Sequence, residues 1–374
     1  MKKTLFEMLA IADQERIHTQ VIAWLLTYGS SPLSTTDQAR LINHLFNVDL
    51  PVDEIKNIKI ITELNNLDLA IIHKKAFIVI ENKLKSKQSK DQLKRYSTEI
   101  QNLKDTSTFD ISAEPIKFFL TFSGELSDQE DWRSIDYKHI HESLVAIDSK
   151  ENYIVDYIEL LRKLISSRDD FLINHNNYKE IFRRSGMKAV NRLNNPLSTE
   201  NENIKFICEN KLERIFIETL FRKITNNCNL KKAEINESHG VALIHVDFFS
   251  FKALENPNHL FKVGYQIQGD SIKYVLMSLY DYQNSSKEDL PKHTISLLEF
   301  VFHNMGFKSN SAKSKAYHSW SKKISQSEMI ENLTFDEFSS KLKTDLFDAE
   351  DFWKINLLKL EADRKISELA VIDM

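Results

Sequence analysis

Two short runs of apolar and β-branched residues, 67–72 and 76–83, are separated by only three residues, two of which are lysines. This feature constrains the fold most, because strands joined by so short a turn pair antiparallel, whereas parallel strands need a crossover of a dozen residues or more. If the two lysines occupy the turn, the register places Asp68 opposite Glu81. Directly opposed side chains on one sheet face have Cβ atoms about 4.5–5.5 Å apart. The hairpin therefore predicts two neighbouring carboxylates on otherwise apolar strands.

These two carboxylates need a positive partner, since like charges that face each other destabilise a sheet. Lys83 lies two residues beyond Glu81 and shares its face, while Asn82 points to the other face and offers only its main-chain carbonyl. Two acids beside one ammonium group are typical of a site for a hard cation, Mg²⁺ or Mn²⁺. The alternative is an ordinary ion pair at a strand end, which is favoured for Asp68 alone but not for the three charged residues together.

The segments around the hairpin predict a mixed sheet flanked by helices. Apolar residues at helical spacing predict helices at 3–27, 36–46 and 89–103, and β-branched runs predict strands at 58–64 and 116–122. This order of elements is typical of an α/β fold of mixed α+β character. His139 and His141 alternate as on one face of a further strand, and we interpret them as structural.

The length of 374 residues predicts two domains, because one compact core rarely holds so many. The polar stretch 194–203, which contains a proline, is the candidate linker between a domain at 1–193 and a domain at 204–374. The second domain should be α+β, with a helix at 204–224, a strand meander over 241–280 and a mostly helical tail from residue 296. It is the expected place for substrate selection or subunit contact.

Composition limits the partners and the compartment. A net charge of -4 gives no global attraction to nucleic acid, so any such surface must be a local patch. The only cysteines, Cys208 and Cys228, exclude a disulfide framework and a four-cysteine zinc site. No run approaches the ~20 apolar residues of a membrane span. The sequence therefore predicts a cytoplasmic protein with no membrane partner.

Two basic stretches are candidates for such a local patch. The first follows the hairpin and comprises Lys85, Lys87, Lys90, Lys94 and Arg95. A run of this kind is usually a solvated face, but beside a metal site it is equally suited to a phosphate backbone. The second stretch, 313–323, mixes lysines with aromatic residues and could clamp nucleic acid, although packing of its aromatic rings on the second domain is favoured.

Three further polar residues are candidates for the site. Glu15 shares a helical stripe with Ile11 and Ile22, so it should face buried residues and could be a third metal ligand. The alternative is a partly exposed glutamate at the edge of the helix. Gln92 and Tyr96 are i, i+4 neighbours and present an amide and a phenol on one helix face. They either orient the site and contact a phosphate, or anchor the helix on the sheet.

The same residues stand in the order of a known family pattern. Within 68–83, an aspartate, twelve intervening residues and the letters ENK resemble the acid, the variable hairpin and the (D/E)-x-K motif of the PD-(D/E)xK nuclease superfamily. Upstream, Glu15 followed by the letters AWLL at 23–26 is similar to the first helix of one bacterial branch. Downstream, the QLxxY pattern at 92–96 is similar to the helix that follows the motif in that branch. The likeness covers residues 11–122 and implies a restriction-endonuclease-like core.

The resemblance also implies an activity, a metal dependent hydrolysis of nucleic-acid phosphodiester bonds. DNA is favoured over RNA, and an endonuclease that leaves a 5′-phosphate over an exonuclease. The implied ligands of Mg²⁺ or Mn²⁺ are Asp68, Glu81, Asn82 and Glu15. The implied catalytic residues are Asp68, Glu81, Lys83, Gln92 and Tyr96, and the first basic stretch is the implied nucleic-acid-binding surface.

The biological role implied by analogy with superfamily members is restriction or phage defence. The alternative is a catalytically inactive nuclease-like fold that binds nucleic acid or protein. A paired set of carboxylates facing a phosphate argues against that alternative, because a binding module has no need of it. A homodimer is compatible with either function.

Overall fold

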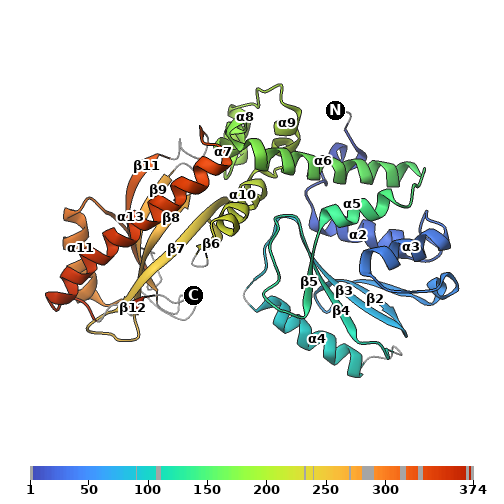
Figure 1. Ribbon diagram of the computed structural model, residues 1–374, viewed down its shortest axis with the longest axis horizontal. Coiled ribbons are helices and arrows are strands. Elements are labelled where there is room, and N and C mark those ends of the chain that lie inside the picture. The colour runs from blue at the N-terminus through green and yellow to red at the C-terminus, as the bar shows by residue number, and fades with distance from the viewer. Residues whose placement is uncertain are drawn as a thin grey trace. The chain divides into compact units, whose positions relative to one another are not determined.

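The computed structural model describes residues 3–89, 91–106, 111–230, 233–238, 240–268, 271–279, 290–311, 317–326, 332–367 and 370–371. Its contacts divide the chain into two compact units (Figure 1). The first unit consists of Met1–Asp170 and Leu197–Thr219, and the second of Phe171–Pro196 and Leu220–Met374. The assignment of separate functions to 1–193 and 204–374 stays a prediction.

The first unit is built on a five-stranded sheet in the order β1-β2-β3-β4-β5. Its strands are β1 (Lys59–Leu64), β2 (Leu67–His73), β3 (Ala76–Lys83), β4 (Pro115–Thr121) and β5 (Trp132–Asp136). The first three strands pair antiparallel because short turns join them, whereas β4 and β5 extend the sheet in parallel. The predicted mixed sheet is confirmed.

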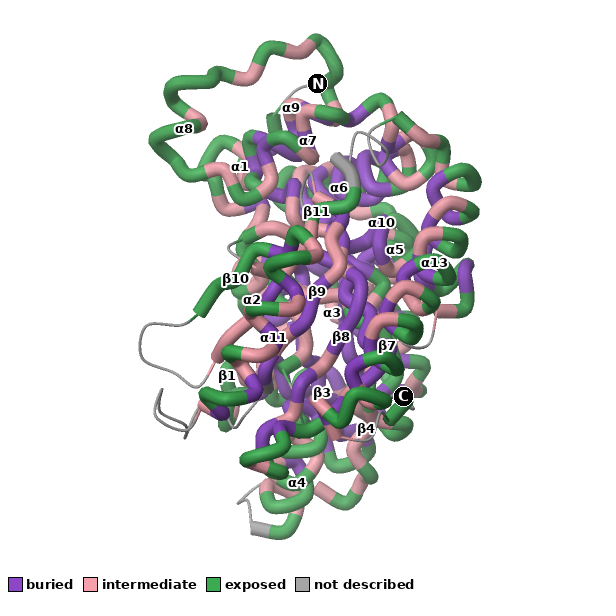
Figure 2. The backbone as a smooth tube through the Cα atoms, turned by 90° about the vertical axis from the view of Figure 1, so that its left-hand side faces the viewer, coloured by how far each residue is buried: buried purple, intermediate pink, exposed green. Residues whose placement is uncertain are grey.

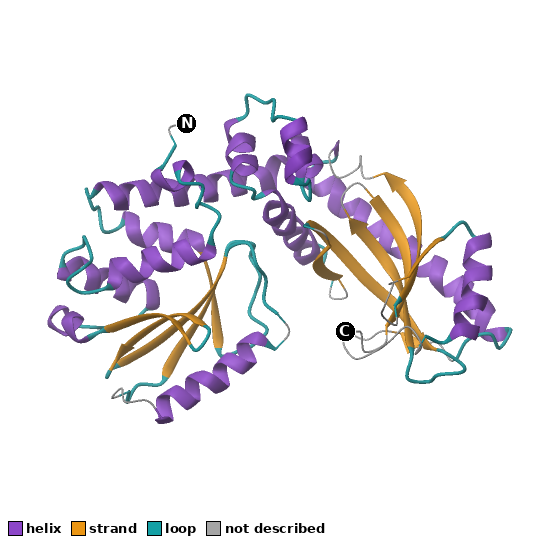
Figure 3. Ribbon diagram, turned by 180° about the vertical axis from the view of Figure 1, so that it is seen from behind, coloured by secondary structure: helices purple, strands orange, loops and turns teal. Residues whose placement is uncertain are grey.

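Helices cover both faces of this sheet (Figure 1 and Figure 3). On one face lies α4 (Gln92–Thr106), and on the other lie α2 (Glu15–Leu26), α3 (Thr35–Phe46) and α5 (Tyr137–Val145) (Figure 1). The first unit also contains α1 (Leu5–Met8), η1 (Val52–Asn57), α9 (Glu202–Glu209) and most of α6 (Asn152–Asn174), and it shares α10 (Glu213–Asn227) with the second unit. On the face of α4, Leu93 and Ile100 join a core with Phe77. On the face of α2, α3 and α5, the rings of Phe46 and Phe118 pack with centroids 5.3 Å apart. The sheet is therefore buried on both sides.

Two predictions about the first unit are wrong. The single helix expected at 3–27 is two helices, because Ala10 has a φ of 56° that no right-handed helix contains. Ile11 consequently lies outside the helix of Glu15. His139 and His141 lie on α5, not on a strand, and Asp136 caps that helix by accepting the main-chain N–H of Lys138 at 2.6 Å.

The second unit is built on an antiparallel sheet in the order β10-β11-β9-β8-β7-β12, with β6 paired to β7. Its strands are β6 (Ala233–Ser238), β7 (Val241–Lys252), β8 (Leu260–Gln268), β9 (Ser271–Leu279), β10 (Lys308–Ser311), β11 (His318–Gln326) and β12 (Ala370–Val371). Its helices are η2 (His175–Asn177), α7 (Lys179–Arg184), α8 (Ala189–Asn194), α11 (Lys292–Asn304) and α13 (Phe335–Ala362). The long helix α13 crosses one face of the sheet, where Trp353 Nε1 donates to the carbonyl of Gly264 at 2.9 Å (Figure 1).

The mostly helical tail expected from residue 296 is only partly correct, because β10 and β11 lie within it. Trp320, in the second basic stretch, is 1 % exposed and its Nε1 donates to Glu299 at 2.9 Å. Its ring therefore packs in the interior of this unit, as the favoured alternative for this stretch predicts. Lys313 and Lys315 of the same stretch lie outside the described residues.

The interior of each unit follows its central strands: the tube is coloured as buried along β3 and most of β7, and it alternates between buried and intermediate along β8 (Figure 2). Seven of the eight residues of β3 are buried, which explains why its sequence is apolar on both faces. No described helix is long and apolar enough to cross a membrane.

Candidate active site

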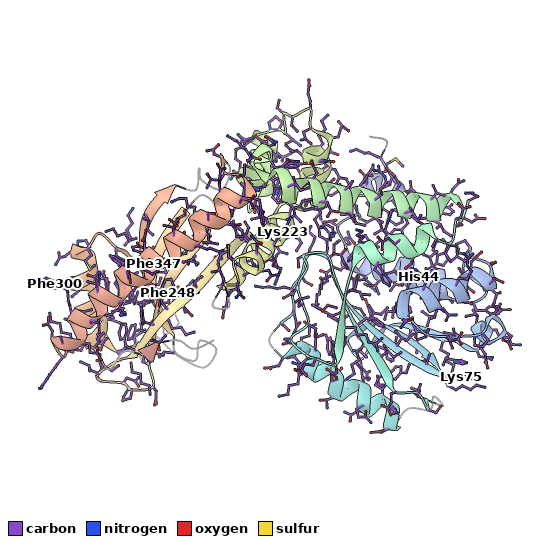
Figure 4. All side chains as sticks on the ribbon, in the orientation of Figure 1. His44, Lys75, Lys223, Phe248, Phe300 and Phe347 are labelled. Atoms are coloured by element: carbon purple, nitrogen blue, oxygen red, sulfur yellow. The ribbon has the colours of Figure 1, made fainter. Side chains whose placement is uncertain are left out.

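The hairpin of β2 and β3 has the register that the sequence predicts. His73 pairs with Ala76 and Leu69 with Ile80, and Lys75 lies at the turn (Figure 4). One step further along this register, Asp68 lies opposite Glu81. The carboxylate of Asp68 accepts the main-chain N–H of Asn82 at 2.7 Å, which fixes it beside the end of β3.

Glu81 is the most enclosed of the charged residues at this point. Its residue is 2 % exposed, and its Oε1 atom accepts from Lys83 Nζ at 2.7 Å and from Gln92 Nε2 at 2.8 Å. Among the described residues, no donor reaches Oε2 of Glu81. One carboxylate oxygen is therefore saturated, while the other has no donor among those residues, and the carboxylate of Asp68 is close enough to Glu81 to share a proton with it. This arrangement is costly unless a proton or a cation is present.

The two carboxylates perturb each other's ionisation. Burial, followed by the charge of Asp68, raises the pKa of Glu81 to about 8. Burial also raises the pKa of Asp68, although the N–H of Asn82 opposes that effect. Burial disfavours the charge of Lys83, but the carboxylate of Glu81 outweighs burial and raises the pKa of Lys83. The lysine thus remains an ammonium group beside an acid pair that favours holding a proton or a cation.

This donor set fits a small hard cation. Asp68 and Glu81 supply carboxylate oxygens, and Oε2 of Glu81 is a buried oxygen in need of a positive partner. Among the described residues, no group of three or more His, Cys, Asp or Glu side chains is arranged to hold a metal. Two carboxylates suffice for Mg²⁺, which commonly keeps several waters and uses one or two carboxylates together with substrate phosphates.

Glu15 lies next to this pair but has partners of its own. It is the first residue of α2, and its carboxylate accepts the main-chain N–H of Ser86 at 2.9 Å and the Ser86 hydroxyl at 2.8 Å. Its charge contributes to raising the pKa of Asp68 and of Lys83. The carboxylate of Glu15, on α2, is thus bonded to the loop that follows Lys83, and its role as a metal ligand stays a prediction.

Asn82 points to the opposite face of the sheet, as strand alternation predicts. Its amide donates to the carbonyl of Glu15 and to the hydroxyl of Thr19, each at 3.0 Å. Its side-chain oxygen accepts from the hydroxyl of Tyr137 at 2.7 Å. The residue between Glu81 and Lys83 therefore ties β3 to α2 and α5 and holds the catalytic strand in register with both helices.

Gln92 and Tyr96 lie beside the acid pair at the start of α4. Gln92 is buried, and its amide donates to Tyr96 Oη at 3.0 Å as well as to Glu81. Its own oxygen accepts the main-chain N–H of Ser89 at 3.1 Å. Gln92 therefore orients Glu81 directly, whereas Tyr96 reaches the acid through Gln92.

The first basic stretch is divided between a loop and a helix. Lys85 pairs with Asp13 at 2.6 Å and is half-buried, whereas Lys94 and Arg95 are exposed on α4. Lys87 lies half-buried in the loop, and Lys90 lies outside the described residues. The exposed cations of α4 are the part of this stretch that is open to a large anionic ligand.

Sequence reasoning missed the residues that hold the loop after Lys83. Arg214 of α10 donates to the carbonyl of Lys85, and Glu125 accepts the main-chain N–H of Gln88 at 3.2 Å. Both are distant from the motif in sequence and belong to no local pattern. Only the fold brings them to the site.

Comparison with known proteins agrees with this geometry. Residues 4–183 match the model of the PD-(D/E)XK nuclease superfamily, a range that contains the hairpin, α2 and α4. The searches of curated proteins and of solved structures gave no match. Nucleases of this superfamily act on nucleic acid and generally use divalent metal ions. Through residues 4–183, the chain belongs to the PD-(D/E)XK nuclease superfamily.

Proposed function

We propose that this protein is a Mg²⁺- or Mn²⁺-dependent endonuclease that hydrolyses phosphodiester bonds in DNA. The observation that carries the proposal is the buried carboxylate of Glu81, which lies between Asp68 and Lys83 with one oxygen lacking a donor. A structural ion pair would need neither the second acid nor the unsatisfied oxygen. Burial of such a group is costly, so its presence favours a role in binding and catalysis.

Asp68 and Glu81 would hold the cation, which when bound lowers the pKa of a water molecule and polarises a phosphate oxygen. Lys83 keeps its ammonium charge beside them, and Nζ is the group placed to stabilise negative charge that develops on the phosphate or on the attacking water. Gln92 fixes the orientation of Glu81 through its amide. The main-chain N–H of Asn82 fixes Asp68 in the same way.

The finer parts of the proposal rest on surface charge and analogy. Lys94 and Arg95 are exposed on α4, the helix that also carries Gln92, and they are suited to contact a phosphate backbone. A 5′-phosphate product and a role in restriction or phage defence are proposed by analogy with the superfamily alone. A cytoplasmic location is consistent with the free thiols of Cys208 and Cys228.

The proposal is tested by incubating the protein with plasmid, single-stranded DNA, tRNA and total RNA, each with Mg²⁺, Mn²⁺ or a chelator. We expect internal cleavage of plasmid that requires a metal. Glu81→Gln and Lys83→Ala should each reduce the cleavage rate at least about a hundredfold, because each removes a group that acts on developing charge. Lys75→Ala is the matched control, since Lys75 lies 55 % exposed at the other end of the same hairpin.

Metal binding is measured separately by thermal unfolding. A cation that binds only the folded state raises the melting temperature with the logarithm of its concentration once that exceeds Kd, and Glu81→Gln should weaken that rise. Full activity in the chelator, or in Lys83→Ala, would refute the mechanism. Binding of nucleic acid without cleavage under every condition would instead support the inactive binding module.

A further inference from the structure

The chain between Lys83 and α4 is held from several directions. We define residues 84–89 as the post-strand loop. Ser86 is bound through its main-chain N–H and its hydroxyl by Glu15, and the side chain of Lys85 pairs with Asp13 at 2.6 Å. The main-chain N–H of Gln88 donates to Glu125 at 3.2 Å. The loop is thus bonded to several distant segments, although it contains no regular secondary structure.

One further anchor comes from outside the part of the chain that matches the family. Arg214, in the first turn of α10, donates through one guanidinium nitrogen to the main-chain carbonyl of Lys85. Another nitrogen of the same group donates to Glu218 at 3.0 Å. The side chain of Arg214 is 18 % exposed and that of Glu218 is 2 % exposed. The contact therefore lies in a largely enclosed place, where such a charged bond resists competition from water.

We propose that Arg214 is a positioning residue of the nuclease site, a role that rests on the function proposed above. The carbonyl that it binds belongs to Lys85, two residues after Lys83. The position of Lys83 Nζ depends on the backbone where β3 ends. A fixed post-strand loop therefore restricts where that ammonium group can lie, and a displacement of about 1 Å can lower a rate about a hundredfold.

The attachment of α10 itself does not require this arginine. Phe216, on the same helix, packs on Phe122 with ring centroids 5.5 Å apart. Leu212 and Ile215 are also buried, at 0 % and 1 % exposed. These apolar contacts hold α10 in the first unit, so the role of Arg214 can be separated from the role of the helix.

Arginine suits this role better than lysine does. Its planar group presents several donors in a fixed arrangement, so it can bind a carbonyl and a carboxylate together. A lysine at this position could bind one of them as a flexible point charge. The working nuclease unit consequently extends beyond residue 183, to include at least the part of α10 that lies in the first unit.

The inference is tested with Arg214→Met and Arg214→Lys in the full chain. Arg214→Met keeps the length of the side chain but removes every donor. We expect its kcat, measured well below the melting temperature of each protein, to fall tenfold to a hundredfold with KM little changed. The melting temperature should also fall, because the buried carboxylate of Glu218 loses its arginine partner. Arg214→Lys should recover part of the loss. The matched control is Arg162→Met, because Arg162 is an exposed arginine of α6 that pairs with its neighbour Glu159 on the same helix.

Hydrogen–deuterium exchange gives a second readout that does not depend on activity. In Arg214→Met, the amides of Ser86 and Gln88 should exchange at least several-fold faster than in the parent protein, whereas those of α10 should not change. Unchanged exchange in the post-strand loop would overturn the inference, as would an unchanged kcat. If the parent protein cleaves nothing, the proposed nuclease function fails, and the exchange result still decides whether Arg214 holds the loop.

Discussion

At the scale of single residues, the site combines groups that would be unfavourable in isolation. Burial and the charge of Asp68 raise the pKa of Glu81, burial also raises the pKa of Asp68, and Lys83 opposes both increases. An acid with a pKa of about 8 takes up a proton at neutral pH when no cation is present. The cation proposed to bind here would have to displace that proton, so its binding should weaken as pH falls.

Close to this site, His18 is a buried histidine whose bonds specify its neutral form. Its Nε2 lies 3.0 Å from the carbonyl of Ala12, which can only accept, so this nitrogen carries the proton. Its Nδ1 then accepts from the hydroxyl of Tyr157 at 3.1 Å. Burial lowers the pKa of His18 to about 4, from an ordinary value of 6.5.

We predict that His18 makes the protein less stable in mild acid. Below pH 6.5 the unfolded chain protonates this histidine, while the folded chain keeps it neutral until about pH 4. The stabilising contribution of neutral His18 to the free energy of unfolding is fully present above pH 6.5 and is lost as pH falls from 6.5 to 4. The loss amounts to about 2 kcal/mol between pH 7 and pH 5. Denaturant unfolding of the parent protein and of His18→Gln at both pH values measures this. An identical pH dependence in the two proteins would contradict the prediction.

At the scale of secondary structure elements, Asn82 connects the catalytic strand to two helices. Its side chain bonds to Glu15 and Thr19 of α2 and to Tyr137 of α5. All three contacts lie on the sheet face away from the acid pair. The motif thus alternates, so that its two charged residues face the proposed site and the residue between them serves the packing.

Asn82→Ala should therefore destabilise the fold. The substitution leaves buried groups on both helices without a partner, and we expect a loss of about 3 kcal/mol in the free energy of unfolding. Asn57→Ala is the control, because Asn57 is exposed and its amide donates to the neighbouring Glu54 at 2.8 Å. That control should stay within about 0.5 kcal/mol. Equal effects of the two substitutions, measured by denaturant unfolding, would show that the Asn82 bonds add nothing.

Elements defined by local pattern could be predicted from the sequence. The hairpin was predictable because a short turn fixes its register, and α4 because its apolar residues recur at helical spacing. The strands within 308–326 were not, since β10 is exposed at every position and carries no alternating pattern. The break near Ala10 was missed because a positive φ at alanine follows from its surroundings and not from its sequence.

The residues of the candidate site also divide into those that a local pattern marks and those that only the fold brings together. Asp68, Glu81 and Lys83 could be grouped because strand alternation operates over a few residues. Arg214 is 129 positions from Lys85, and nothing in a helix of ordinary composition marks one arginine as a loop anchor. Ser86 and Glu125 could not be predicted from the sequence for the same reason, because their hydrogen bonds depend on the packing of loops that are distant in the chain. Which of the grouped residues perform chemistry stays a prediction.

At the scale of the whole molecule, the chain passes between its two units more than once. It leaves the first unit after Asp170, returns at Leu197 and leaves again after Thr219. The last of these crossings falls inside α10, so one continuous helix carries Arg214 and Phe216 of the first unit and Leu220 of the second. The first unit is therefore not a simple N-terminal segment.

A fragment of residues 1–193 should accordingly be defective. It lacks Phe216, so the ring of Phe122 loses a partner and an apolar surface is exposed. We expect this fragment to unfold at a lower temperature than fragment 1–227, which keeps all of α10, and to bind more of the dye ANS. Thermal unfolding of the two fragments compares them. Equal melting temperatures would exclude α10 from the stable nuclease unit.

The return of the chain at Leu197 has a consequence for synthesis on the ribosome. A nascent chain emerges N-terminus first, at about 5–20 residues per second. The sheet from β1 to β5 can pair as soon as Asp136 has emerged, but its helix α10 arrives only after the whole of Phe171–Pro196, which belongs to the other unit. Throughout that interval the acid pair and Lys83 exist without the arginine that anchors their loop. The proposed site thus gains this anchor only when translation has passed the middle of the chain.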